Sequence, residues 1–226
     1  METNNKLNNI DTKMINGIVY SFDKRENICK IVNIPANAID ILIPKSINYE
    51  SKEYIVTTIC KDSLKYSKNL KSIQVPSNSE IQIIEKGVFA KRSIESITIP
   101  RKVAHIYDYA FYQCKNLQIV EIQMNSELQI IGQLAFAYSS IESFSIPPSV
   151  TQIGKYAFFD CIKLKRIDIS NNSELQIIEE GAFANSSIES FYIPQKVTQI
   201  GLAAFSGCER LKTVNIPENS ELQIIE

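Results

Sequence analysis

The fold is decided by the stretch VTQIGKYAFFDCIKLKRIDI, residues 150–169, which returns 47 residues later as VTQIGLAAFSGCERLKTVNIP, residues 197–217. A second segment, SEIQIIE in its first copy, keeps the same step and begins at Ser79, Ser126, Ser173 and Ser220. Self-similarity at a fixed period of this length is typical of solenoid proteins. The 47-residue unit is therefore the repeat from which the fold is built.

Each 47-residue unit is itself a doublet of two coils. A strand-like motif, apolar-x-x-apolar-x-apolar, occurs seven times between Leu70 and Ile216, in steps that alternate between 24 and 23 residues. Proline follows five of the seven copies, and it ends a strand because it has no N–H to give to the ladder. Since side chains alternate along a strand, positions four and six should face inward and positions three and five outward.

A recurring Ala-Phe pair follows the second extended stretch in five of the coils, as at Ala157 and Phe158. We expect it to begin a short helical or 3-10 turn, with the phenylalanine in the core and a small Cys or Ser three residues later. No coil can bury its own apolar face, so the coils must stack. The pattern predicts an α/β solenoid, a right-handed superhelix with one parallel β-sheet, short helical or 3-10 turns and coils of 23 and 24 residues.

The two ends of the chain differ from the middle. We expect residues 1–13 to be a disordered tail and residues 14–35 to form a β-hairpin that caps the first coil against water. The solenoid would then cover residues 36–226 and stop in the middle of a repeat. Such an uncapped C-terminal end exposes apolar core and predicts possible self-association there.

The pattern V-T-x-I-G-x-x-A-F-x-x-C-x-x-L-x-x-I-x-I-P, present from Val150 to Ile169 and from Val197 to Pro217, resembles the BspA-like leucine-rich repeat family. The chain departs from it at Gln123 and Ser170, which replace the proline after the strand. The resemblance implies a leucine-rich-repeat superhelix of the kind found in surface proteins of bacteria and parasitic protozoa. It also implies adhesion to host matrix proteins or to other cells.

The chemistry of the chain gives no indication of an enzyme. No phosphate-binding loop, catalytic triad, cofactor motif or metal cluster is visible, and the single histidine, His105, takes a slot that holds glutamine in sister repeats. A net charge of −1 gives no reason to expect a nucleic-acid partner. The longest apolar stretch is interrupted by polar residues and proline, so no membrane span is expected in this chain.

The outward face of the parallel sheet is the candidate site for a protein partner. Charges nearly alternate along its second motif position, so one interpretation is a self-neutralised surface that sets the register of the coils. The other is a recognition face in which Ile119, Arg166 and Tyr192 stand out. Its candidate residues are Glu95, Thr98, Gln118, Ile119, Glu121, Glu142, Ser145, Lys165, Arg166, Asp168, Glu189, Tyr192, Lys212 and Asn215.

A group of tyrosines near the turns is the other surface candidate. Its members are Tyr107, Tyr109, Tyr112, Tyr138 and Tyr156. Packing between coils explains this group better than binding of a ligand does. We therefore expect a non-catalytic protein-binding module with no cofactor, acting as a cell-surface adhesin or host-interaction protein. The alternative is an intracellular, cytoplasmic scaffold. It is favoured by the polar N-terminus, which lacks a signal peptide, and by cysteines that look reduced.

Overall fold

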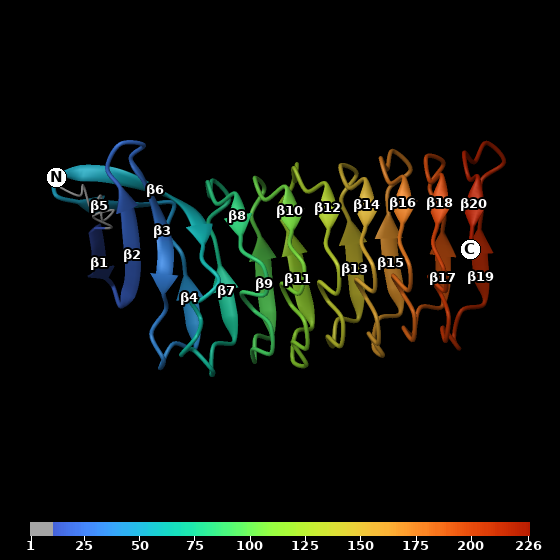
Figure 1. Ribbon diagram of the computed structural model, residues 1–226, viewed down its shortest axis with the longest axis horizontal. Helices are drawn as coiled ribbons and strands as arrows, with labels where there is room; N and C mark the ends of the chain where they lie inside the picture. Colours follow the sequence, from blue (N-terminus) through green and yellow to red (C-terminus); the bar gives the residue numbers. More distant parts are fainter. Residues whose placement is uncertain (1–10) are drawn as a thin grey trace, which may run out of the picture.

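The computed structural model describes residues 11–226, and its coils stack side by side along the longest axis of the molecule (Figure 1). One wall of the stack is a row of parallel strands formed by the apolar-x-x-apolar-x-apolar motif and its first, degenerate copy. We call this wall the long-strand face. Its strands are β4 (Asp40–Leu42), β7 (Ser72–Gln74), β9 (Ser96–Ile99), β11 (Ile119–Ile122), β13 (Ser143–Ile146), β15 (Arg166–Ile169), β17 (Ser190–Tyr192) and β19 (Thr213–Asn215). Neighbouring coils therefore place equivalent residues side by side, as Ser145 and Asp168 are in β13 and β15.

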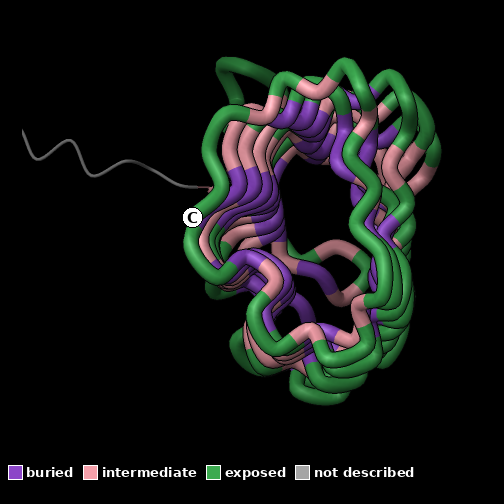
Figure 2. The backbone as a smooth tube through the Cα atoms, turned by 90° about the vertical axis from the view of Figure 1, so that its right-hand side faces the viewer, coloured by how far each residue is buried: buried purple, intermediate pink, exposed green. Residues whose placement is uncertain are grey.

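A second parallel ladder forms the opposite wall, where a single sheet had been predicted. Its strands are only two residues long. In most coils a glycine or glutamate directly follows the second residue of the strand, and a turn begins there. These strands are β8 (Ile83–Ile84), β10 (His105–Ile106), β12 (Ile130–Ile131), β14 (Gln152–Ile153), β16 (Ile177–Ile178), β18 (Gln199–Ile200) and β20 (Ile224–Ile225). Strands β10 to β20 form one continuous sheet. Figure 2 looks along the stack and shows that buried residues occur in both walls around the interior.

The core consists of rows of identical positions. The predicted inward positions four and six are buried in most central coils, for example Ile97 and Ile99, and are partly buried at Val120, Ile122 and Ile169. The phenylalanines of the turns form a stack with ring centroids 5.0–5.5 Å apart and interplanar angles of 9° or less. Its members are Phe89, Phe111, Phe136, Phe158, Phe183 and Phe205. Stacked rings at this spacing add to the stabilisation that burial itself provides.

The turns that carry these phenylalanines are not helical, and the prediction of helical or 3-10 turns is therefore wrong. No helix occurs between residues 11 and 226. Two left-handed residues bracket each turn, as Tyr156 (φ 55°) and Asp160 (φ 53°) bracket Phe158. Only three residues lie between them, which is too short a right-handed segment to close a helical turn and continue it. The coil is therefore built of strands and hydrogen-bonded turns.

A mixed sheet of six strands closes the N-terminal end of the stack; five are longer strands, and the sixth is β8 of the short ladder, which pairs in parallel with β6. The order of the longer strands is β1 (Asp11–Ile15), β2 (Ile18–Asp23), β3 (Ile28–Asn33), β6 (Lys52–Ile59) and β5 (Ser46–Tyr49). β2 and β3 pair as an antiparallel hairpin within the segment predicted to form one. Residues 11–13 of the predicted tail belong to β1, where they pair with β2. The rest of that tail, residues 1–10, lies outside the described residues.

The small residue three positions after the phenylalanine connects neighbouring coils. The thiol of Cys114 donates to the carbonyl of Phe89 at 3.0 Å, and that of Cys161 donates to the carbonyl of Phe136 at 3.2 Å. Ser139 takes the same position in an intervening coil and lies 3.4 Å from the Cys161 sulfur. All five cysteines of the chain are free thiols. Cys114 and Cys161 therefore act as buried donors between coils.

We expect Cys114 and Cys161 to resist alkylation in the folded protein. Burial raises the pKa of each thiol to about 12. At pH 8 only about 1 in 10,000 of such thiols would be a thiolate, the form that reacts. Mass spectrometry after brief iodoacetamide treatment should find both cysteines unmodified in buffer and modified in urea. Rapid labelling of either cysteine in buffer would contradict the packing described here.

Replacing Ser63 by alanine should stabilise the protein. The Ser63 hydroxyl is buried without a hydrogen-bond partner in the described structure, and alanine takes its position in sister coils, as at Ala157. Removing an unsatisfied buried hydroxyl should raise the free energy of unfolding by about 1 kcal/mol. The matched control is Ser67→Ala, because the Ser67 hydroxyl donates to the carbonyl of Ile34 at 2.7 Å. Urea denaturation should show opposite signs for the two variants, and equal destabilisation would contradict this interpretation.

Candidate protein-binding face

All fourteen residues proposed from the sequence lie on the long-strand face, in its three outward rows. These rows are the second, third and fifth positions of the strand motif. Twelve of the fourteen residues are exposed, and only Thr98 and Tyr192 are half-buried. Ile119 is the clearest apolar feature among them, since 54% of its surface is accessible to solvent. The structure therefore brings the predicted residues together on one surface.

The alternating charges of the second row do not form a continuous ladder of ion pairs. Along this row only Lys71 and Glu95 approach each other within ion-pair distance, at 3.0 Å, in the part of the chain that the structure describes. On β15, Arg166 instead pairs with Asp168 of its own strand, with 3.1 Å between Nε and the carboxylate oxygen. Exposed pairs of this kind contribute little to stability. The remaining charges of the face are available to a partner.

The long-strand face is interrupted twice. β4, β7, β9 and β11 form one sheet, β13 and β15 form a second, and β17 and β19 form a third. No strand pairing joins β11 to β13 or β15 to β17 within residues 11–226. On the strand that precedes each gap the last inward side chain is only partly buried; these side chains are Ile122 and Ile169.

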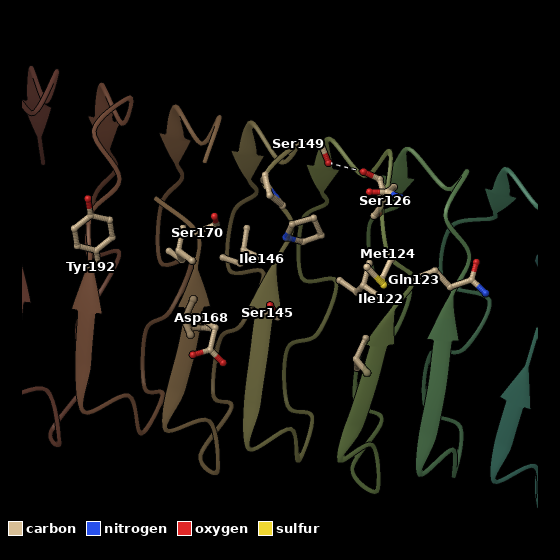
Figure 3. Close-up of a pocket in the computed structure, with 16 residues that line it drawn as sticks. Ile122, Gln123, Met124, Ser126, Ser145, Ile146, Ser149, Asp168, Ser170 and Tyr192 are labelled. Carbon is tan, nitrogen blue, oxygen red and sulfur yellow. Dashed lines mark hydrogen bonds between the residues drawn. The ribbon is translucent and has the colours of Figure 1, made fainter. Parts of the chain in front are cut away.

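A groove of ≈ 840 Å³ opens at the ends of β11, β13, β15 and β17 (Figure 3). We call it the strand-end groove. Its apolar lining includes Ile122, Ile146 and Ile169, and its polar lining includes Asp168 and Ser170. A volume in this range is typical of sites that hold a small ligand or a few side chains of a partner.

The two departures from the proline pattern both line this groove. Gln123 turns its side chain away from the groove, toward the preceding coils (Figure 3). Its amide nitrogen donates to the carbonyl of Pro76 at 3.0 Å. Its amide oxygen accepts from the backbone N–H of Arg101 at 3.0 Å. Ser170 donates its hydroxyl to Asn172 in its own loop. Neither position supplies the ring that proline places there in other coils, which leaves the groove open.

The sequence-based choice of residues found only part of this site. Ser145, Asp168 and Tyr192 were predicted and line the groove, whereas Ile119 and Arg166 lie outside its lining. The outward-row criterion missed the loop residues that follow each strand; these are Gln123, Met124, Asn125, Ser126, Pro147, Pro148, Ser149 and Ser170. The replacement of proline at Gln123 and Ser170 was the sequence signal that could have found them.

The tyrosines near the turns pack against one another across coils. Tyr112 and Tyr138 meet edge to face at 5.7 Å between ring centroids, and Tyr138 meets Phe159 at 5.4 Å. Tyr109 and Tyr156 join the same row through Tyr112 and Phe159. Tyr107 is exposed and lies 5.8 Å from the ring of His105, which is half-buried on β10. These contacts support the packing interpretation of the aromatic group.

Two further features of the described residues bear on function. Residues 11–226 contain no group of three or more histidine, cysteine or carboxylate side chains placed to hold a metal ion. Over the same residues, no helix is long and apolar enough to cross a membrane.

Comparison with known protein families tests the relationship to BspA-like leucine-rich repeat proteins that the repeat pattern implies. The model of the BspA-type leucine-rich repeat region matches residues 42–147 and 129–226, which is more than half of the chain. The chain belongs to the BspA-type leucine-rich repeat family. A comparison with curated protein sequences gave no significant match.

Solved structures of other leucine-rich repeat proteins share the fold of this BspA-type chain. A leucine-rich repeat protein from Bacteroides ovatus is 23% identical with a TM-score of 0.65, over 94% of this chain and 66% of that one. A leucine-rich cell surface protein from Faecalibacterium prausnitzii is 23% identical with a TM-score of 0.63, over 93% and 55%. The pneumococcal vaccine antigen PcpA is 24% identical with a TM-score of 0.63, over 93% and 51%. The BspA-type chain thus spans about half to two thirds of the length of these proteins.

Proposed function

We propose that this BspA-type chain is a non-catalytic module that binds a protein partner through its long-strand face. The observation that carries the proposal is the coincidence, on one wall, of unpaired charges, the exposed Ile119 and the strand-end groove with Tyr192 at its edge. Aromatic and arginine side chains beside apolar residues are common anchors of protein interfaces. Extended repeat surfaces are used for such binding in solenoid proteins.

The proposal includes a place of action, the cell surface, and a role in adhesion to host matrix proteins or cells. It is supported by the family and by the names of two structural neighbours, a cell surface protein and a vaccine antigen. An antibody against the chain should stain intact cells of the source organism. Staining that requires permeabilised cells would overturn the surface role and favour the intracellular scaffold.

Binding itself can be tested with purified matrix proteins coated on a sensor surface. The folded chain should bind at least one of them with a dissociation constant in the micromolar range or below, as specific interfaces do. Binding should saturate and persist at physiological salt. Failure of every coated protein and of whole host cells to bind the chain would contradict the adhesion role.

Self-association of the 226-residue chain through residues 211–226 is a second candidate, because apolar side chains are exposed there. Val214, Ile216 and Ile225 are exposed here, whereas their equivalents in central coils are largely buried. Strand β20 also lies at the open edge of the short ladder. Such edges and apolar patches pair readily with a second copy.

Sedimentation velocity of the 226-residue chain should show a dimer that forms with increasing concentration, and Ile225→Lys should suppress it. A monomer at every concentration would rule this contact out.

A further inference from the structure

We infer that the strand-end groove binds an extended peptide segment of a partner that carries an apolar side chain next to a lysine or arginine. The inference rests on the proposed function, since it names the kind of protein segment that the long-strand face receives. It concerns the ends of β11, β13, β15 and β17 and the loops that follow them.

The apolar part of the segment is indicated by the lining of the groove. Ile122, Ile146 and Ile169 lie in its apolar wall. Because Gln123 and Ser170 stand where other coils have proline, two rings that would fill this space are missing. Met124 stands at the rim with 86% of its surface exposed. A methionine is flexible and polarisable, and such side chains adapt to a bound apolar group.

The basic part of the segment is indicated by the charges beside the groove. The fifth motif position holds no lysine or arginine on any of the eight strands, but it holds Glu121 and Asp168. Asp168 and the ring of Tyr192 both line the groove. Asp168 is already paired with Arg166, whose side chain is largely exposed, so a cation of the partner would compete with Arg166 for this carboxylate. A lysine or arginine of the partner would therefore meet a carboxylate and an aromatic face together.

The extent of the groove fixes the form of the segment. It crosses the ends of four strands, and parallel coils spaced about 4.8 Å apart give a length of roughly 15 Å. An extended chain rises about 3.4 Å per residue, so about four to five residues fit. We take the segment to be extended, because a strand places alternate side chains along a groove of this length.

The variant Ser170→Pro should change binding at the strand-end groove without disturbing the fold. It restores the residue found at this position in five of the seven coils and adds a ring to the groove wall. The Ser170 N–H donates to no backbone carbonyl among residues 11–226, so the ladder loses nothing. Proline at a compatible position stabilises a protein by restricting the unfolded chain. The variant should therefore melt at the same temperature as the parent or higher. Ser170→Ala, which removes the hydroxyl without adding a ring, is the matched control.

The experiment measures fluorescence anisotropy of two labelled peptides, GSLKSLKSG and GSLESLESG, with the full chain. We expect the lysine peptide to bind about tenfold more tightly than the glutamate peptide. Ser170→Pro should weaken it by about tenfold or more, and Ser170→Ala by no more than about twofold. The double variant Glu121→Gln, Asp168→Asn should reduce the preference for lysine to about threefold or less.

Three results would overturn the inference. One is equal binding of the two peptides, or no binding of either. Another is full binding by a folded Ser170→Pro variant. The third is a dimer of the chain that Ser170→Pro dissolves, which would make a second copy the occupant. A matrix protein that still binds the chain while both peptides fail would refute this groove assignment alone and leave the proposed function standing.

Discussion

Phe158→Ala is expected to lower the free energy of unfolding by about 3–5 kcal/mol, as truncation of a fully buried aromatic side chain does. Phe158 has no exposed surface. Its ring stacks 5.3 Å from Phe136 on one side and 5.3 Å from Phe183 on the other, and Phe144 approaches it edge-on at 5.1 Å. Alanine would leave a cavity in the middle of the stack and remove three aromatic contacts at once.

Urea denaturation followed by circular dichroism measures this change. The matched control is Phe159→Ala, because Phe159 is the next residue in the chain but lies half-buried in the outer row of tyrosines. We expect the control to cost clearly less than Phe158→Ala. Equal costs for the two variants, or a loss below about 1 kcal/mol for Phe158→Ala, would show that the phenylalanine stack does not hold the coils together.

The triple variant Ile119→Ala, Arg166→Ala, Tyr192→Ala is expected to stay folded and to lose binding to a matrix-protein partner by about 30-fold or more. The three side chains come from three different coils of one face. Ile119 and Arg166 are exposed, and Tyr192 is half-buried at the groove, so their removal should cost little stability. Interface anchors of these residue types each contribute more to affinity than their neighbours do.

A control triple with the same residue types lies elsewhere on the molecule. Ile162→Ala, Tyr107→Ala and Arg210→Ala remove an isoleucine, a tyrosine and an arginine that are exposed outside the long-strand face. Biolayer interferometry should find its affinity within about twofold of the parent. If the control triple loses binding and the face triple retains it, the partner binds another side of the solenoid.

Much of the fold follows from the sequence because the repeat copies constrain one another. The positions that face inward could be assigned from the spacing of Ile97 and Ile99 alone, since the same alternation recurs in every coil. The burial of Cys161 also follows, because a small Cys or Ser shares its position in the other coils, except at Arg92. Because the coils stack on one another, a correct assignment for one coil extends to the whole solenoid.

The turns could not be predicted in the same way. Tyr156 and Asp160 adopt left-handed backbone conformations, which the residue type of Tyr156 does not favour. The neighbouring coils impose these conformations through hydrogen bonds such as that from the Tyr156 N–H to the carbonyl of Glu180 at 2.9 Å. Such constraints come from tertiary packing, and a local pattern of Ala-Phe cannot reveal them. The second ladder was missed for a similar reason, because two-residue strands are too short to show alternation.

The repeat pattern predicts which face of the solenoid holds the candidate site, but it does not predict the groove on that face. Alternation predicts that Asp168 and Tyr192 point outward; in the structure Asp168 is exposed and Tyr192 is half-buried. The groove beside them depends on two breaks in strand pairing and on the absence of two proline rings. Gln123 and Ser170 were visible as departures from the repeat, but the space that they leave depends on where their side chains turn.

Oxidative footprinting of two methionines tests the central claim, that a partner binds the long-strand face. Met124 stands at the strand-end groove with 86% of its surface exposed, and Met14 lies on the N-terminal sheet with 62% exposed. Exposed methionines oxidise readily to the sulfoxide, so both should react in the free chain. With a bound matrix protein, we predict that oxidation of Met124 falls by about fivefold or more while that of Met14 is unchanged. Unchanged oxidation of Met124 in a saturated complex would contradict the account.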